Sequence, residues 1–330
     1  MGTITKLQTH IIKMKQILAI YLFFAAFATV NAQQLANYTL YRDHWTILNP
    51  AAMTNNYILN ELPNTVNASY HRQWGSINDG GAPTLQNIGF QRVAKEDRIV
   101  FGGYILNDKT GLIGNTGIYG NFAYRILFGR RFDQSISIGL SAGLVQYRAK
   151  ITQIAFADPE NLTNQTETKF FPDFSMGIFY HFDDKVYAGL SIPQTFGLNT
   201  EFRTEDGSFY IERTPHIYAI AGAYFDAAWL GNDASFFEPS IWLKYVPNSP
   251  LSLDLNGRYQ HGEVFWVGLG GGLSMGERIA KNAHFETGVI IGEGIGVEYG
   301  HLKIGVGFDW FFAPVATLGN GFEVMLSFSW

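Results

Sequence analysis

Residues 321–330 read Gly-Phe-Glu-Val-Met-Leu-Ser-Phe-Ser-Trp and alternate strictly between two kinds of side chain. In an extended chain, one face would carry only large apolar groups: Phe322, Val324, Leu326, Phe328 and Trp330. The other face would carry Gly, Ser, Met and one Glu. Outer-membrane β-barrels alternate in this way, because apolar side chains face lipid while small or polar ones face the lumen. The stretch therefore predicts the closing strand of a transmembrane antiparallel β-barrel.

The other end of the chain predicts export. Met14 begins a segment whose apolar run spans residues 17–28, and residues 30–32, Val-Asn-Ala, offer a cleavage site. The run is shorter than the roughly 20 residues that a membrane-spanning helix needs. We therefore expect residues 1–32 to be a signal peptide, with Met14 as an alternative start.

The composition agrees with a membrane barrel. Charged residues make up only 15% of the chain, aromatic residues also 15%, and there are 36 glycines. A soluble domain carries about 25% charged residues, so one face of this protein is expected to meet a solvent other than water. Removing residues 1–32 deletes three lysines and no acidic residue, which moves the formal charge from −5 to −8. This acidic balance argues against a nucleic-acid partner. The lack of cysteine excludes disulfides and a lipoprotein anchor.

Alternation and turn residues divide the rest of the chain into fourteen candidate strands. Their average length, about ten residues, suits a tilted strand that crosses the hydrocarbon. An even number with both ends in the periplasm is typical of a single-chain bacterial barrel. The predicted strands are 64–74, 84–93, 98–108, 116–128, 135–147, 174–181, 186–193, 216–226, 235–245, 251–259, 264–274, 289–299, 302–312 and 321–330.

The predicted connections differ between the two ends of the barrel. One end has short turns such as Gly300-His301, whereas the other has long loops, as expected for the periplasmic and outer sides. The long outer loops are Arg148–Asp173, Gln194–Pro215 and Met275–Gly288. One strand fits imperfectly: Glu293 falls on the apolar face of 289–299, which indicates a bulge or a later start.

The face that we assign to the lumen carries charges of both signs: Arg125, Asp254, Arg258, Glu298, Lys303, Asp309 and Glu323. In a narrow barrel such residues pair with one another and close the pore, because an unpaired buried charge is costly. The alternative is an open polar channel for small solutes. Strand number does not decide between the two, since an interior of this size can be plugged or open.

Residues 33–63 lack a strand pattern. Because Asn49, Pro50 and Pro63 interrupt any regular element there, we expect a periplasmic N-terminal segment that tucks under or into the barrel. The barrel itself would then run from residue 64 to 330.

Several short motifs occur in a fixed order along the mature chain. They are Asn49-Pro50-Ala51, His71-Arg72-Gln73-Trp74 with Gly81-Ala82-Pro83-Thr84, the run 102–111, Asn115-Thr116-Gly117 with Tyr124-Arg125, Pro172-Asp173-Phe174, the run 187–193, and Lys244-Tyr245-Val246-Pro247 with the run 250–255. This ordered set resembles the PorP/SprF family of the Bacteroidota type IX secretion system. Residues 270–283 depart from the family's pattern.

The resemblance implies an integral outer-membrane barrel that is not an enzyme. Family members serve protein secretion and gliding motility, some at the periplasmic machinery and others as dedicated partners of very large surface adhesins. The implied partners are outer-membrane lipid, a secreted adhesin or other type IX cargo, and periplasmic type IX machinery subunits. Motif residues with a candidate partner-binding role are Asn49, Pro50, Arg72, Trp74, Pro83, Asn107, Asp108, Gly111, Lys244 and Pro247.

Our first hypothesis is therefore a non-catalytic interaction protein that supports secretion or surface anchoring of a large adhesin and docks to the periplasmic machinery. Aromatic side chains of the outer loops would anchor the cargo. These are Phe170, Phe171, Phe196, Phe202, Phe209 and Tyr210. The alternative is a passive outer-membrane porin.

A third hypothesis, an outer-membrane lipid or peptide hydrolase that uses His71, has less support. None of His71, His181 and His284 accompanies a nucleophile motif such as Gly-x-Ser-x-Gly. The glycine clusters at 268–272 and 292–296 precede no helix, so they do not match a phosphate-binding loop. The eight histidines are scattered and have no cysteines beside them, so the sequence predicts neither a metal nor a cofactor.

Overall fold

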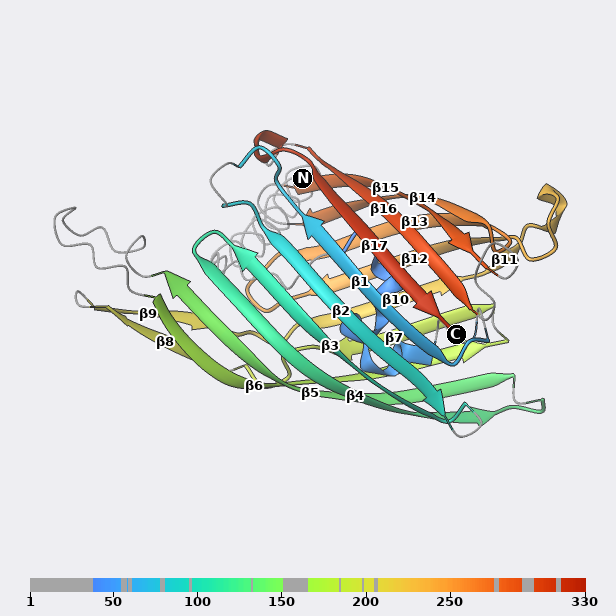
Figure 1. Ribbon diagram of the computed structural model, residues 1–330, viewed down its shortest axis with the longest axis horizontal. Helices are drawn as coiled ribbons and strands as arrows, with labels where there is room; N and C mark the ends of the chain where they lie inside the picture. Colours follow the sequence, from blue (N-terminus) through green and yellow to red (C-terminus); the bar gives the residue numbers. More distant parts are fainter. Residues whose placement is uncertain are drawn as a thin grey trace, which may run out of the picture.

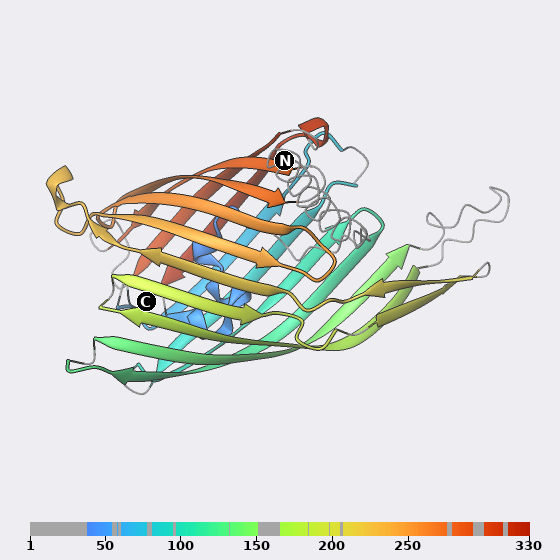
Figure 2. The same ribbon diagram turned by 180° about the vertical axis from the view of Figure 1, so that it is seen from behind.

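A computed structural model of the chain describes residues 38–54, 58, 61–77, 81–94, 97–131, 133–150, 166–183, 185–197, 199–204, 207–275, 279–292, 300–312 and 316–330. Fourteen antiparallel strands form a closed barrel (Figures 1 and 2). They are β1 (Asn64–Arg72), β2 (Thr84–Ala94), β3 (Ile99–Thr110), β4 (Ile113–Phe128), β5 (Gln134–Lys150), β6 (Thr166–Phe182), β7 (Val186–Ile192), β10 (Ile217–Ala223), β12 (Phe236–Tyr245), β13 (Leu251–His261), β14 (Phe265–Met275), β15 (Ile279–Ile291), β16 (His301–Phe311) and β17 (Gly321–Ser329).

The ring closes where the first strand meets the last. β1 pairs with β17 from Thr65 opposite Ser329 to Arg72 opposite Phe322. The pairing continues to the chain end, because the backbones of Asn64 and Trp330 exchange hydrogen bonds of 3.1 and 3.0 Å. The ring has no free edge at this seam, as a strand surrounded by lipid requires.

The closing strand β17 separates large apolar side chains from mostly small or polar ones, as the sequence predicts. On β17, Phe322, Val324 and Leu326 point outward and are 38 to 50% exposed, whereas Glu323 and Met325 face the lumen and are at most 1% exposed. The outward side chains are the ones that would meet lipid. The structural prediction of a barrel with a lipid-facing apolar surface is therefore confirmed.

The prediction for the third strand from the end was wrong. Residues 279–291 form β15, and its pairing with β16 ends at Ile291 opposite Leu302. The alternation pattern missed this strand because its inward face carries His284 and Glu286. The residues 289–299 showed a clearer apolar face and were predicted as the strand instead. Most of the predicted outer loop 275–288 is therefore strand. Residues 293–299, with Glu293 and Glu298, lie outside the described residues.

The outer wall is also taller than predicted. β5 and β6 are each 17 residues long and pair up to Lys150 opposite Thr166, so the ends of the predicted loop Arg148–Asp173 are strand. Beyond β7, the chain forms a separate hairpin of β8 (Asn199–Thr204) and β9 (Gly207–Glu212). Figure 1 shows this hairpin beside the tall edge of β5 and β6, at the end opposite the C terminus. We call this end outer and the other periplasmic, following the predicted orientation.

The segment that precedes β1 lies inside the barrel. It contains η1 (Tyr41–Asp43), the helical turn α2 (Trp45–Leu48) and η2 (Pro50–Thr54). Figures 1 and 2 show it in blue between the walls. We call residues 38–54 the plug. Among the described residues, no helix has the length and apolarity to cross a membrane.

Candidate functional site

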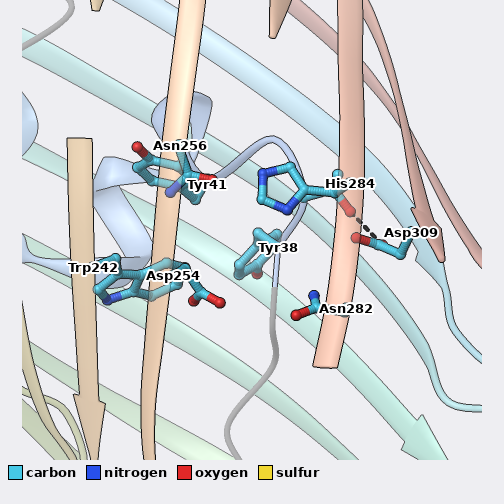
Figure 3. A pocket seen from close by; sticks show the side chains of 9 residues that line it. Tyr38, Tyr41, Trp242, Asp254, Asn256, Asn282, His284 and Asp309 are labelled. Atoms are coloured by element: carbon cyan, nitrogen blue, oxygen red, sulfur yellow. Dashed lines mark hydrogen bonds between the residues drawn. The ribbon is translucent and has the colours of Figure 1, made fainter. Parts of the chain in front are cut away.

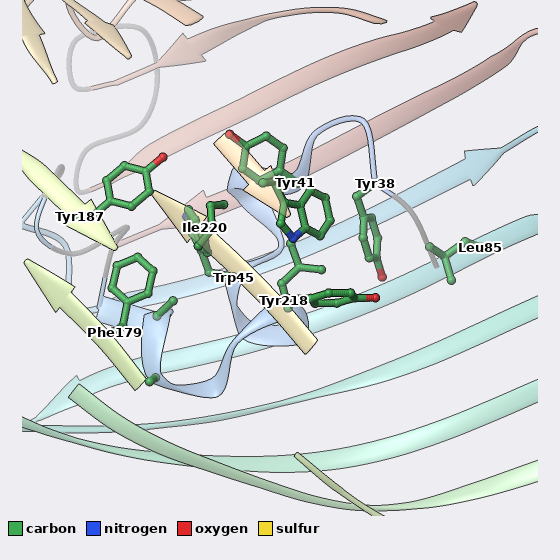
Figure 4. Packing of buried hydrophobic residues seen from close by; sticks show 12 residues of the cluster. Tyr38, Tyr41, Trp45, Leu85, Phe179, Tyr187, Tyr218 and Ile220 are labelled. Carbon is green, nitrogen blue, oxygen red and sulfur yellow. The ribbon is translucent and has the colours of Figure 1, made fainter. Parts of the chain in front are cut away.

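The plug packs one aromatic face against the wall (Figure 4). The Trp45 ring meets Phe179 of β6 edge to face, with ring centroids 5.4 Å apart, and Tyr187 of β7 at 5.9 Å. Tyr41 lies 5.3 Å from Trp242 of β12. All five side chains are at most 3% exposed. Edge-on aromatic pairs in this range add to the stabilisation that burial alone gives.

The Asn49-Pro50-Ala51 motif docks onto glycines of the wall. The Asn49 side-chain amide donates to the carbonyl oxygens of Ile178 and Leu190, both at 3.3 Å. Its Oδ1 accepts a 2.9 Å bond from the Ala51 N–H. A Cβ at Gly177 would overlap the Asn49 amide, and one at Gly139 would collide with the backbone of Pro50 and Ala51. Glycine is required at both positions because the plug approaches the wall so closely.

Wall side chains also satisfy the plug's backbone carbonyl groups. Asn67 of β1 donates to the Asp43 carbonyl at 2.6 Å, and Asn121 of β4 donates to the Thr46 carbonyl at 2.6 Å. The hydroxyl of Ser191 on β7 donates to the Leu48 carbonyl at 2.7 Å. Short helical turns leave many backbone groups without internal partners, so these wall donors let the turns stay buried.

Arg42 is the centre of a buried ion network. Its Nε lies 2.9 Å from a carboxylate oxygen of Glu238 on β12, and its Nη1 lies 3.1 Å from Glu286 on β15. Nη2 donates to the Ser240 hydroxyl at 3.0 Å. Burial alone would lower the pKa of Arg42, but the charge of Glu238, followed by Tyr41 and Glu286, raises this pKa well above its ordinary value. The guanidinium is therefore charged, and it contacts carboxylates on two strands of the wall.

Glu323 of β17 binds the start of the plug. Its carboxylate accepts backbone bonds from Thr39 at 2.7 Å and Leu40 at 3.0 Å, and its other oxygen lies 2.7 Å from His44 Nε2. Asp309 of β16 accepts a 2.5 Å bond from the Thr39 hydroxyl. Glu323 and His44 are fully buried, so water does not weaken these bonds.

A small cavity of about 10 Å³ remains beside the plug, roughly the space of one water molecule. Figure 3 shows Tyr38 of the plug and His284, Asp309 and Asp254 of the wall around it. The plug therefore fills the centre of the lumen, where its residues are almost all buried.

Of the predicted lumenal charges, Glu298 lies outside the described residues, and the other six lie on the inward face, where several meet the plug. Asp254 pairs with Lys244 at 2.5 Å, and Arg258 lies 4.0 Å from Asp43 of the plug. Arg125 and Lys303 also face inward. Glu323 and Asp309 hold the plug as described above. These residues belong to a mixed, largely paired network rather than to a lining of one sign.

The ten motif residues fall into two groups in the structure. Asn49 and Pro50 lie in the plug. The others lie near the outer ends of the strands: Arg72, Trp74 and Pro83 beside β1 and β2, Asn107, Asp108 and Gly111 at the β3–β4 turn, and Lys244 and Pro247 at the end of β12. The motif residues of β1, β2 and β3 therefore lie close together at the outer end of the barrel. Asn49 and Pro50, in contrast, lie deep inside it.

Sequence reasoning missed a second buried ion pair, in the outer half of the barrel. Arg213, which follows β9, lies 2.6 Å from Asp173 of β6, and its side chain is fully buried. The Tyr119 hydroxyl donates to the same Asp173 oxygen at 2.8 Å. Arg213 Nη1 donates to the Pro172 carbonyl at 3.4 Å. The motif Pro172-Asp173 was visible in the sequence and could have marked Asp173 as important. Nothing in the sequence marked Arg213, 40 residues later, as its partner.

The arrangement around His71 does not match a hydrolase site. His71 Nε2 lies 3.2 Å from Asp309 Oδ2, and the Thr39 hydroxyl donates to the same oxygen. The Asp309 carboxylate therefore lies between the Thr39 hydroxyl and the His71 imidazole. In a catalytic triad the imidazole lies between the hydroxyl and the carboxylate. Among the described residues, no group of three or more histidine or acidic side chains could hold a metal ion.

Comparison with protein families gives one match. The family described as "Type IX secretion system membrane protein PorP/SprF" matches residues 30–328. A search of curated proteins finds no match.

Solved structures with a similar fold are outer-membrane barrels. A FadL homologue from Pseudomonas aeruginosa superposes with a TM-score of 0.53 and 11% identity, covering 87% of this chain and 93% of that one. The monoaromatic hydrocarbon channel CymD gives a TM-score of 0.50 and 9% identity, covering 87% and 91%. At such low identity the likeness concerns the fold alone.

Proposed function

Because this chain belongs to the PorP/SprF family of type IX secretion system membrane proteins, we propose that it supports secretion or surface anchoring of a large adhesin. In this proposal its periplasmic end docks to the secretion and gliding machinery. The family and the fold place the protein in the outer membrane, in contact with lipid, and the family is one of secretion components rather than enzymes. The observation that carries the proposal is the plug, since a filled lumen favours an interaction role over conduction.

The tall outer wall supports a contact with exported protein. β5 and β6 extend past the outward apolar stretch, where Gln146, Arg148 and Lys150 replace apolar side chains on the outward face of β5. The β8–β9 hairpin stands beside this wall, and Arg213 ties the base of the hairpin to Asp173. A rigid polar wall with an attached hairpin is a suitable platform for cargo.

The proposal is tested first by purifying a tagged chain from outer membranes in mild detergent and identifying what co-purifies. We expect a very large secreted protein, periplasmic type IX subunits, or both. A second test replaces residues 199–212 by a short Gly-Ser link that keeps Arg213. Surface display of the adhesin should fall while the barrel stays folded, as judged by heat-modifiable migration. Unchanged display would show that the hairpin is not the contact.

The porin alternative makes an opposite prediction. A passive channel would give steady conductance when the purified protein is inserted into planar bilayers, and substitution of Asp254 or Arg258 would change it. Because the plug is bonded to strands all around the wall, we expect the intact protein to be electrically silent. Steady conductance of the wild type would favour the porin.

Export by a signal peptide also stays a proposal, since residues 1–32 lie outside the described residues. It predicts that protein isolated from the outer membrane begins at Gln33. N-terminal sequencing of the mature protein measures this directly, and a retained Met14 would contradict it.

A further inference from the structure

The turn between β11 (Phe225–Asp226) and β12 carries an exposed tryptophan at the periplasmic end. It contains the 3₁₀ turn η5 (Ala228–Leu230). Trp229 is 82% exposed and Leu230 is 46% exposed. In Figures 1 and 2 this turn stands off the periplasmic end of the barrel as a separate knob. A tryptophan left mostly in water costs the free protein hydration free energy, which a partner that covers it recovers.

Hydrogen bonds hold the backbone of the turn. The Asp226 carboxylate accepts a 2.7 Å bond from the Ala228 N–H, which starts the 3₁₀ turn. Gly231, with φ of 100°, ends it in the left-handed conformation that favours glycine. The return of the chain is fixed by Ala227 donating to the Ser235 carbonyl at 2.9 Å. The Ser235 hydroxyl in turn accepts a 3.1 Å bond from Gly262 of the next turn. The backbone that carries Trp229 is thus held before a partner binds, which lowers the entropy lost on binding.

The charge of the turn differs from that of segments that bind anionic lipid headgroups. Residues 225–235 contain two acidic residues, Asp226 and Asp233, and no lysine or arginine. Segments that lie on anionic membranes are instead rich in basic residues. Phe225 and Phe237, which pair across β11 and β12, already supply outward aromatic side chains at this end of the wall. Trp229 lies beyond them along the chain.

We propose that the Trp229 turn is a docking knob that enters an apolar pocket, rimmed by basic side chains, on a water-soluble periplasmic protein. Tryptophan is among the residues that dominate binding at interface centres, and the two acidic residues beside it give charge complementarity to a basic rim. The knob rests on the proposed function, because it names the surface through which the barrel docks to the periplasmic machinery.

The test compares Trp229→Ala with two other variants. Phe312→Ala is the matched control, since Phe312 is also exposed, at 50%, but lies at the outer end, just after β16. Asp233→Lys reverses a rim charge without removing the Asp226 bond that starts the turn. Each full-length variant is purified in mild detergent and checked for heat-modifiable migration. Each is then titrated with the soluble subunit that co-purifies with the wild type.

We expect Trp229→Ala to bind that subunit at least about tenfold more weakly, Asp233→Lys to bind more weakly mainly at low salt, and Phe312→Ala to bind like the wild type. Equal binding by Trp229→Ala would overturn the knob while leaving periplasmic docking intact. Recovery of no soluble subunit by the wild type would instead contradict the docking part of the proposed function, and the knob with it.

A photo-reactive residue at position 229 separates protein from lipid in intact cells. A cross-link to one soluble protein, weakened by Asp233→Lys, supports the knob. Cross-links to phospholipid alone would make Trp229 a membrane anchor and overturn the proposal.

Discussion

At the residue scale, Arg42 joins the plug to two strands that are far apart in the chain. Its contacts with Glu238 and Glu286 are fully buried, so removing the guanidinium leaves two carboxylates without their cation. Breaking a buried pair in this way costs about 3–5 kcal/mol. We expect Arg42→Ala to lower the free energy of unfolding by that order, measured by urea titration in lipid vesicles. Arg130→Ala, in an exposed periplasmic turn, is the control and should change stability little.

A single methyl group should also disturb the plug. Gly139→Ala places a Cβ against the backbone of Pro50 and Ala51, where nothing flexible can yield. Overpacking of this kind costs about 1–3 kcal/mol. The expected result is faster proteolysis of the plug segment in the folded barrel. Gly120→Ala is the matched control, because a Cβ there meets nothing within 4 Å. Equal protease resistance in both variants would show that the plug does not press on this part of the wall.

At the scale of the element, the plug is what separates this barrel from a pore. Deleting residues 38–54 removes the Arg42 contacts of Glu238 and Glu286 and the His44 contact of Glu323, but it also admits water that solvates these carboxylates. A barrel of this size has an interior wide enough to conduct once it is empty. We expect stepwise conductance in planar bilayers for the deletion variant. The variant that lacks the β8–β9 hairpin but keeps the plug should be as silent as the wild type. Silence of both would show that something else closes the lumen.

Elements whose side chains alternate between lipid and lumen could be predicted from sequence. β17 is the clearest case, since Phe322, Val324 and Leu326 face outward as expected. The prediction for β15 was wrong for a physical reason. The plug gives the inward-facing His284 and Glu286 polar surroundings, and the outward face includes Ala283 and Thr287, which are not typical of a lipid contact. The predicted bounds of β5 and β6 were too short. The outer parts of these strands extend beyond the outward apolar stretch, where apolar and polar residues no longer alternate.

The site was less predictable than the wall. Alternation along β12 places Glu238 inward, yet nothing in the sequence pairs it with Arg42, 196 residues away. The Asn49 motif was visible, but its role depends on the glycines of β5, β6 and β7, which only the folded ring brings together. Long-range pairs of this kind are set by barrel closure, and local patterns carry no information about them.

At the scale of the whole molecule, stability depends on the ring being complete. Without residues 321–330, β1 and β16 would each expose an unpaired edge to lipid, where every unsatisfied backbone group costs several kcal/mol. We expect this truncation to abolish the heat-modifiable folded band, in contrast to the hairpin replacement, which leaves the ring intact. A truncated chain that still migrates as a folded barrel would show that the remaining strands can close on themselves.

The bonds between Glu323 and the plug have a consequence for the order of assembly. The plug comes before every wall strand in the chain, whereas Glu323 lies in the last one, 284 residues after Thr39. A chain exported from its N terminus delivers the plug first and the final fastening last. An unfinished barrel therefore holds its plug by fewer bonds than a finished one. The last strand thus closes the ring and completes the fastening of the plug in the same step.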